Sequence, residues 1–172
     1  MQDGYIKLLI KSAQQGKKNA YRELCEINLK KIYNMAIRFL LNEKMAEVLT
    51  QNIFIEAWKN LKFLREEQLF DVWLKSIAVY KILDELRTET IKSKMIEDGI
   101  ISENDFNIQC KDKYESMILS LPQKERIAFI LHEIEEYTYE EISDFINEME
   151  KEQIKEIIRE TRNSLINTTN NE

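Results

Sequence analysis

The stretch TYEEISDFINEMEKEQIKEIIRETR, residues 138–162, carries the pattern that decides the fold. Thr138 and Glu141 stand three residues apart just before an apolar-periodic run, which predicts a capping box at the start of a helix. After residues 147–150 the helical spacing of apolar residues resumes, so a second helix is expected to run to about Ile166. Two short helices joined by a tight turn have the shape of a helix-turn-helix.

Charge on the second of these helices separates into two rows. The stretch carries eight acidic residues against four basic ones, an excess that opposes contact with an anionic partner. At 3.6 residues per turn, however, the two signs fall on parallel rows about 100° apart. The basic row contains Lys151, Lys155, Arg159 and Arg162, and the acidic row contains Glu148, Glu152, Glu156 and Glu160. Only the basic row needs to face such a partner.

The rest of the chain has the composition of a helical protein. Of its 172 residues 44% are hydrophobic and 33% charged, with three Gly and one Pro, so a core can form and sheets are not expected. Apolar runs such as Ile127–Leu131 are far shorter than the roughly 20 residues of a membrane-spanning helix. No leader precedes Asp3, and Cys25 and Cys110 lack ligand spacing, so a cytoplasmic protein without disulfides or membrane contact is expected.

Helical spacing predicts an all-α fold of two small domains joined by a flexible linker. The first domain, residues 1–87, should contain helices at 5–16, 19–41, 43–61 and 68–87. The expected core stripe of the second helix is Tyr21, Cys25, Leu29, Ile32, Ala36 and Phe39. Trp58, Phe70 and Trp73 also recur at helical spacing and are expected in the core, because large aromatic side chains are more often core than ligand platforms.

Residues 88–113 have weak periodicity and scattered Ser, Asn and Asp, so we interpret them as an acidic linker with at most a transient helical turn. The second domain is residues 114–172. Ser120 and Gln123 predict a capping box before its first long helix, whose apolar stripe ends at Ile134.

No pattern for catalysis or metal binding is found. The one histidine, His132, has no acidic or cysteine cluster at a metal spacing, so a structural or surface role is expected. Phosphate loops and Ser/His/Asp or Cys/His arrangements are also missing from the sequence, and the carboxylates fall at helical spacings near Lys and Arg. The sequence therefore predicts a protein that is not an enzyme and holds no cofactor or metal.

The order of three motifs resembles a known family. MAEVLTQNIFIEAW (residues 45–58) is followed by FDVWLKSIAVYKILDELR (70–87), a linker, and LSLPQKERIAFILHEIEEYTYEEI (119–142) leading into the helix-turn-helix. This succession is similar to the extracytoplasmic-function class of the sigma-70 family of bacterial RNA polymerase sigma factors. The resemblance covers nearly the whole chain and rests on the series, since a helix-turn-helix alone is weak evidence.

The resemblance implies a subunit that binds core RNA polymerase, directs it to promoters and helps to melt the DNA. In the family the first motif docks on the polymerase through carboxylates and an amide. By position, Glu47 and Gln51 match this pattern, and four-residue spacing puts them on one helical face. Asn52 belongs to the same implied polymerase-binding set, although it and Val48 stand where relatives usually have acids.

The second motif implies recognition and melting of the minus-ten element, which requires cations along the phosphates and surfaces that hold extruded bases. The residues at or near the loop that the family uses are Lys59, Asn60, Lys62, Phe63 and Arg65, and those on the following helix are Tyr80, Lys81 and Arg87. Val79 and Tyr80 replace an Arg-Asn pair that is common in relatives, which predicts weaker or different promoter contacts.

The last domain resembles the one that reads the minus-thirty-five element with a helix in the major groove. The implied DNA-binding residues are Lys151, Gln153, Lys155, Glu156, Arg159 and Arg162. Glu156 and Ile157 depart from the family pattern, because relatives carry small or basic groups there and a carboxylate beside phosphate opposes binding.

Two alternatives remain beside the sigma factor. One is a degenerate sigma-like protein that keeps a protein partner but has weak or no promoter binding, and the other is a helical adaptor unrelated to transcription. Residues 1–87 hold 15 basic and 11 acidic residues, whereas residues 114–172 hold 6 and 14, which favours the first domain for electrostatic contact with nucleic acid. An anti-sigma factor is a partner that is common in the family.

Overall fold

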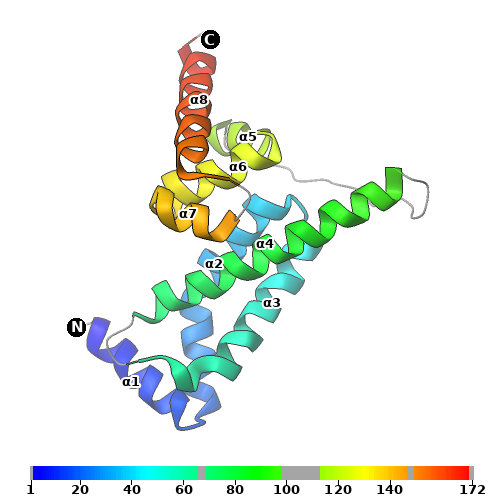
Figure 1. Ribbon diagram of the computed structural model, residues 1–172. Helices are drawn as coiled ribbons and strands as arrows, with labels where there is room; N and C mark the ends of the chain where they lie inside the picture. The colour runs from blue at the N-terminus through cyan, green and yellow to red at the C-terminus, as the bar shows by residue number, and fades with distance from the viewer. Residues whose placement is uncertain (1, 66–68, 98–112, 147–148, 171–172) are drawn as a thin grey trace. The chain divides into compact units, whose positions relative to one another are not determined.

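The computed structural model of the chain describes residues 2–65, 69–97, 113–146 and 149–170. Within these ranges all regular structure is helical, which confirms the predicted all-α fold (Figure 1). The chain divides into two compact units, Met1–Asp105 and Phe106–Glu172. In the described ranges, no helix combines the length and the apolar character that crossing a membrane would require.

The first unit is built around α2. Its elements are α1 (Gln2–Gln14), α2 (Lys18–Leu40), α3 (Glu43–Asn60), the 3-10 turn η1 (Leu61–Phe63) and α4 (Phe70–Glu97). Helix α2 packs against α1, α3 and α4, and α3 packs against α4. Fully buried side chains from three helices form the core, among them Leu24, Met35, Phe39, Ile53, Leu74 and Ile82. This core leaves one side of α3 and the η1 turn at the surface.

Local signals fix the helix ends in this unit. Gly16 ends the turn after α1 with a φ of +85°, a left-handed conformation that glycine adopts without steric cost. Leu41 is also left-handed, with a φ of 54°, and its N–H donates to the Ile37 carbonyl at the end of α2. The Asn42 side chain then accepts a hydrogen bond of 3.0 Å from the Met45 N–H and caps α3.

The predicted core stripe of α2 is partly wrong. Ile32, Ala36 and Phe39 are buried, but Leu29 is 50% exposed. Leu24 and Asn28 lie in the core instead, and the buried Asn28 amide donates to the Leu24 carbonyl at 2.9 Å. Because that bond satisfies the amide, a polar residue could take a core position that hydrophobicity alone assigned to its neighbour.

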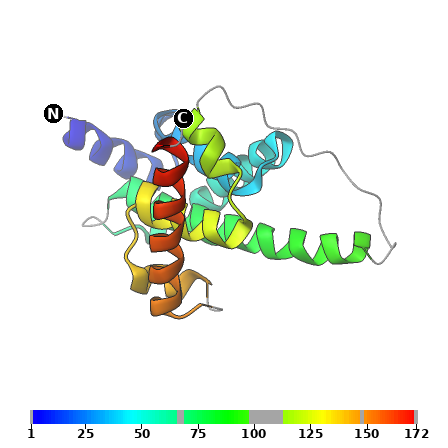
Figure 2. The same cartoon turned by 90° about the horizontal axis from the view of Figure 1, so that it is seen from above.

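Helix α4 extends ten residues past its predicted end at Arg87 and stops at Glu97, so it enters the predicted linker (Figures 1 and 2). Thr88 does not break it, because its hydroxyl donates to the Asp84 carbonyl one turn earlier at 3.1 Å. Residues 88–97 also contain neither Gly nor Pro, so weak apolar periodicity did not mean loss of helix. The rest of the predicted linker, from 98 to 112 and including Cys110, lies outside the described residues.

The second unit contains α5 (Lys113–Leu119), α6 (Gln123–Phe129), the π-helical turn η2 (Ile130–Ile134), α7 (Tyr139–Ile146) and α8 (Lys151–Asn170). Helix α8 packs against α6 and α7. Its inward side chains Ile154 and Ile158 are buried, as are Ile130, Leu131 and Ile142. Helix α8 runs four residues further than predicted.

The two predicted capping boxes have opposite outcomes. The Thr138 and Glu141 box is confirmed, since the Thr138 N–H donates to the Glu141 carboxylate at 2.8 Å and the Glu141 N–H to the Thr138 hydroxyl at 3.3 Å. The box at Ser120 is wrong. Helix α6 has Pro122 at its N-cap without a side-chain cap, and the Ser120 hydroxyl donates to the Met117 carbonyl at the end of α5.

His132 has a structural role, as expected. Its Nδ1 donates to the Tyr137 carbonyl at 2.9 Å, which closes the turn between η2 and α7. The imidazole also stacks on Tyr139, with ring centroids 4.4 Å apart. In the described part of the chain no group of His, Cys, Asp and Glu side chains is placed to hold a metal ion.

Candidate functional site

One face of α3 is exposed along its whole length. Ala46, Leu49 and Ile53 face the core, whereas the predicted polymerase-binding residues Glu47, Gln51 and Asn52 are all exposed. The structure therefore places these three side chains together on a solvent-facing surface.

The same face also carries apolar side chains. Val48 is 58% exposed and Ile55 is 53% exposed, and a spacing of seven residues is two helical turns, so both lie beside Gln51. The family resemblance marks Val48 only as a departure and gives no indication of Ile55. The surface is thus a mixture of amide, carboxylate and apolar groups, the composition of an interface centre as well as a rim.

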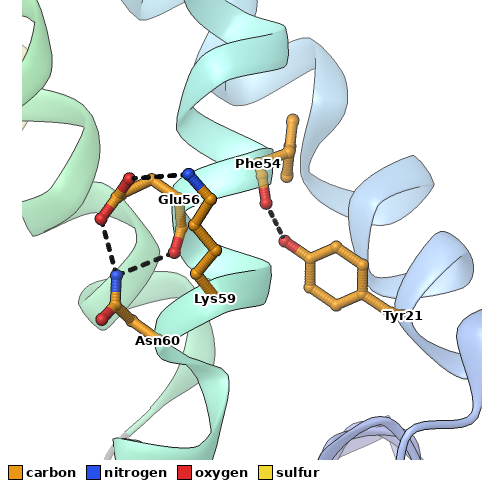
Figure 3. Close-up of polar contacts among 5 residues, drawn as sticks. All are labelled: Tyr21, Phe54, Glu56, Lys59 and Asn60. Carbon is orange, nitrogen blue, oxygen red and sulfur yellow. Dashed lines mark hydrogen bonds and ion pairs between the residues drawn. The ribbon is translucent and has the colours of Figure 1, made fainter.

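Glu56 holds both predicted DNA-binding residues at the end of α3 (Figure 3). The Asn60 amide donates to the Glu56 carboxylate at 2.8 Å and to the Glu56 carbonyl at 2.9 Å, and the Lys59 ammonium lies 4.0 Å from the other carboxylate oxygen. Glu56 is not among the predicted site residues, although its spacing of three and four residues from Lys59 and Asn60 is visible in the sequence. Any phosphate that Lys59 contacts competes with this carboxylate.

Tyr21 fixes the same end of α3 to α2 (Figure 3). Its hydroxyl donates to the Phe54 carbonyl at 2.5 Å, and its ring packs on Trp58 with centroids 4.7 Å apart. Burial raises the pKa of the Tyr21 phenol, and the neighbouring Cys25 raises it further. Of the three aromatic residues expected in the core, Phe70 is buried and Trp58 and Trp73 are half-buried.

The turn after α3 has a buried and an exposed side. Leu61 and Leu64 are 2% and 5% exposed, whereas Phe63 is 67% exposed. The Lys62 ammonium lies 4.8 Å from the centre of the Phe63 ring, within the range of a cation–π contact. Arg65 is exposed as well. Three of the predicted minus-ten residues thus share one short surface segment with an aromatic face and cations.

The three predicted residues on α4 lie further along the molecule. Tyr80 is 59% exposed, Arg87 is exposed and Lys81 is half-buried. At 1.5 Å per residue, Tyr80 is about 15 Å and Arg87 about 26 Å along the helix axis from Phe70. Tyr80 and Arg87 are therefore about 10 Å apart along one helix, so they can contact different parts of a nucleic-acid strand that runs along α4.

All six predicted DNA-binding residues of α8 are exposed, but most already have partners within the second unit. Lys151 pairs with Glu140 of α7, Arg162 with Glu133 of η2, and Arg159 with Glu156 on α8 itself. These contacts lower the pKa of Glu140 and raise those of Lys151 and Arg162, in each case chiefly through the shared hydrogen bond. Glu133 and Glu140 are not among the predicted site residues, because they lie 29 and 11 residues from their partners in the sequence.

The remaining residues of α8 differ in accessibility. The Gln153 side chain accepts a hydrogen bond of 3.0 Å from the Glu150 N–H and so helps to cap its own helix. Lys155 makes no ion pair within the described residues, and Ile157 is half-buried. Glu148 of the predicted acidic row lies outside the described residues. The basic row is therefore present, but carboxylates offset most of its charge.

Two sequence families match separate parts of the chain. The family described as Sigma-70 region 2 matches residues 24–90, and that described as Sigma-70, region 4 matches residues 111–147. Together they span more than half of the chain. The first match covers α2 to most of α4, and the second ends before α8.

Similar curated proteins are sigma factors. The chain is 28% identical to the ECF RNA polymerase sigma factor SigW of Bacillus subtilis, an alignment covering 83% of this chain and 85% of that protein. It is 27% identical to the RNA polymerase sigma-H factor of Pseudomonas aeruginosa, with coverage of 78% and 79%. It is also 25% identical to the ECF RNA polymerase sigma-E factor of Haemophilus influenzae, with coverage of 81% and 82%.

Two solved structures share the fold. The sigma factor RpoE of Bartonella quintana, crystallised with the anti-sigma factor NepR, has a TM-score of 0.60 at 18% identity, covering 84% of this chain and 93% of that one. CnrH, solved with the cytosolic domain of CnrY, has a TM-score of 0.59 at 17% identity, covering 98% and 99%.

Proposed function

This chain belongs to the extracytoplasmic-function class of the sigma-70 family of RNA polymerase sigma factors, and from that premise we propose how its surfaces divide the work of initiation. The protein is a sigma factor, which binds core RNA polymerase and directs it to promoters. The observation that carries this conclusion is the order of a region 2 and a region 4 match, each within its own helical unit. We infer a cytoplasmic, non-enzymatic role, because a sigma factor acts by binding.

We assign polymerase binding and the minus-ten element to residues 1–87 and the minus-thirty-five element to residues 114–172, with the intervening residues as a connection that α4 enters. The α3 surface of Glu47, Gln51 and Asn52, with Val48 and Ile55 beside them, is the proposed polymerase contact. Its support is joint exposure on one side of a well-packed helix.

The proposed minus-ten surface is the segment from Lys59 to Arg65 together with α4. An exposed aromatic ring with cations around it is what capture of an unstacked base requires. Phe63, with Lys62 at its face, offers that combination in the described residues.

Helix α8 is the proposed reader of the minus-thirty-five element. Lys155 and the paired cations Lys151, Arg159 and Arg162 are its phosphate contacts. An anti-sigma factor is a further proposed partner, since both structural neighbours were solved with a partner protein, which in the Bartonella quintana complex is an anti-sigma factor.

The pairing on α8 favours a second candidate, a sigma-like protein that binds polymerase but reads promoters weakly. Three of its four basic-row residues are paired with carboxylates, and the region 4 match ends before this helix.

One experiment separates these functions. Core polymerase with the full chain would be incubated with promoter fragments carrying randomised minus-thirty-five and minus-ten elements, and stable open complexes and transcripts would be recovered. If the chain is a sigma factor that recognises both elements, the recovered fragments should be enriched in particular sequences at the minus-thirty-five and the minus-ten element. Polymerase binding with selection at the minus-ten element alone, or at neither, supports the second candidate, and no polymerase binding would end both.

Replacing Glu156 with Arg is expected to strengthen binding to a minus-thirty-five duplex. The change removes the carboxylate that pairs with Arg159 and adds a cation. Because each new phosphate contact steepens the logarithmic salt dependence by about 0.9, the slope should increase by roughly one to two. Fluorescence anisotropy at several salt concentrations measures both quantities.

Glu26→Arg is the matched control, since Glu26 pairs with Arg22 on an exposed face of α2 in the first unit and the charge change is identical. An equal effect of both variants would mean that net charge alone is responsible. An unchanged slope for Glu156→Arg would place this residue away from the DNA backbone.

A further inference from the structure

Gln14 connects α1 to the turn that carries Phe63. Its side-chain amide donates to the Leu61 carbonyl at 3.0 Å and to the Leu64 carbonyl at 2.9 Å, across 47 and 50 residues of sequence. An amide NH₂ has two hydrogens, so one group can hold both carbonyls at once. These carbonyls lie at the two ends of the segment that presents Lys62 and Phe63.

The position of Gln14 is itself fixed. It is the last residue of α1, whose Leu9 and Ala13 side chains are buried. Two residues later Gly16 turns the chain, with its N–H donating to the Ala13 carbonyl at 2.8 Å. The amide is therefore carried by a helix end that cannot shift without moving core side chains.

The turn has few internal constraints of its own. It is a single 3-10 turn of three residues, closed by a bond of 3.1 Å from the Leu64 N–H to the Leu61 carbonyl. Leu61 and Leu64 anchor it through burial, but burial of two side chains does not set the direction of the backbone between them. The Gln14 bonds to the Leu61 and Leu64 carbonyls supply that second constraint.

We propose that Gln14 is a positioning residue for minus-ten base capture, holding the Leu61–Leu64 backbone so that Phe63 and Lys62 are presented in one orientation. The inference rests on the proposed function of this segment. It adds a residue from α1 that lies outside the region 2 match, which begins at residue 24.

The test compares four variants of the full chain. Gln14→Met keeps the length of the side chain and removes both donors, whereas Gln14→Lys supplies an ammonium with three donors. Gln15 is the neighbouring control, because it is exposed like Gln14 but makes no side-chain hydrogen bond within the described residues. Gln15→Met controls for the apolar change and Gln15→Lys for the added charge.

The first readout needs no DNA. Trypsin cleavage after Lys62 and Arg65 should become roughly fivefold faster in Gln14→Met, because the turn opens more often when two hydrogen bonds are lost. It should be near the wild-type rate in Gln14→Lys and in both Gln15 variants. Unchanged cleavage in Gln14→Met would overturn the proposal, whatever the chain does at promoters.

The second readout follows base capture with a 2-aminopurine probe in the minus-ten element of a polymerase complex. Gln14→Met should slow the fluorescence change by roughly fivefold to tenfold, while polymerase affinity stays at the wild-type value and the melting temperature falls by only a few degrees. Gln14→Lys should restore most of the wild-type rate of the fluorescence change. Any increase that Gln15→Lys shows over the wild type is due to the added charge and is subtracted first.

Two outcomes count against the positioning role. Failure of Gln14→Lys to recover the rate, or an equal loss in Gln15→Met, would show that donation to the two carbonyls is not the cause. If the wild-type chain gives no fluorescence change at all, the proposed minus-ten function fails, whereas the cleavage result still decides whether Gln14 holds the turn.

Discussion

Replacing Gln51 with Arg is expected to weaken binding to core polymerase by at least about thirtyfold. Gln51 lies between Val48 and Ile55 on the exposed side of α3. In a docked complex the new cation would lose water among apolar groups and would draw the Glu47 carboxylate, four residues earlier on the same face, away from the polymerase. Losing such a contact at an interface centre costs about 2 kcal/mol or more. Titration of labelled core polymerase with the full chain measures the change.

Gln15→Arg is the matched control for this prediction, since it makes the same substitution at an exposed glutamine of the same unit. Its polymerase affinity should equal that of the wild type, and thermal melting should show that both variants are folded. Wild-type affinity in Gln51→Arg would exclude this face of α3 as the polymerase surface.

Replacing Phe63 with Ala should lower the rate and stability of open-complex formation by roughly one to two orders of magnitude. Stacking of one base on an aromatic ring contributes about 1–3 kcal/mol, and Phe63 is the most exposed aromatic side chain in the described residues. Folding should change little, because so exposed a ring contributes little to the core. Permanganate reactivity of thymines in the minus-ten element measures the open complex.

Two further variants define the result for Phe63. Phe63→Trp keeps an aromatic face and should retain most of the activity. Tyr114→Ala removes an aromatic side chain that is 55% exposed in the second unit and should have no effect on opening of the promoter DNA. Equal activity of Phe63→Ala and the wild type would show that the base is held elsewhere, and Tyr80 would be the next residue to examine.

The helices were predictable from sequence where the pattern is local. The Thr138 and Glu141 box is a contact over three residues, and the buried residues Ile32, Ala36 and Phe39 of α2 follow its predicted helical spacing. Errors arose where two local solutions compete. Ser120 could cap the helix ahead of it or the one behind it, and only the packed chain shows that it serves α5.

The exposure of the functional residues was predictable from the sequence, but the residues that they contact were not. The family resemblance pointed to Lys59, Asn60 and the cations of α8, and all are at least partly accessible. It could not indicate that Arg162 meets Glu133 across 29 residues, or that Gln14 reaches the turn after α3 across about 50. Such contacts depend on how helices pack, which the pattern of one helix does not contain.

The packing of Trp58 against Tyr21 has a spectroscopic consequence. The chain has two tryptophans, Trp58 and Trp73, and both belong to the first unit. Trp58 lies at the end of α3, next to Lys59 and Asn60, in van der Waals contact with a neighbouring phenol ring. Intrinsic tryptophan fluorescence therefore originates from that unit alone. It can report binding beside the proposed minus-ten surface, whereas α8 contains no tryptophan and contributes no signal.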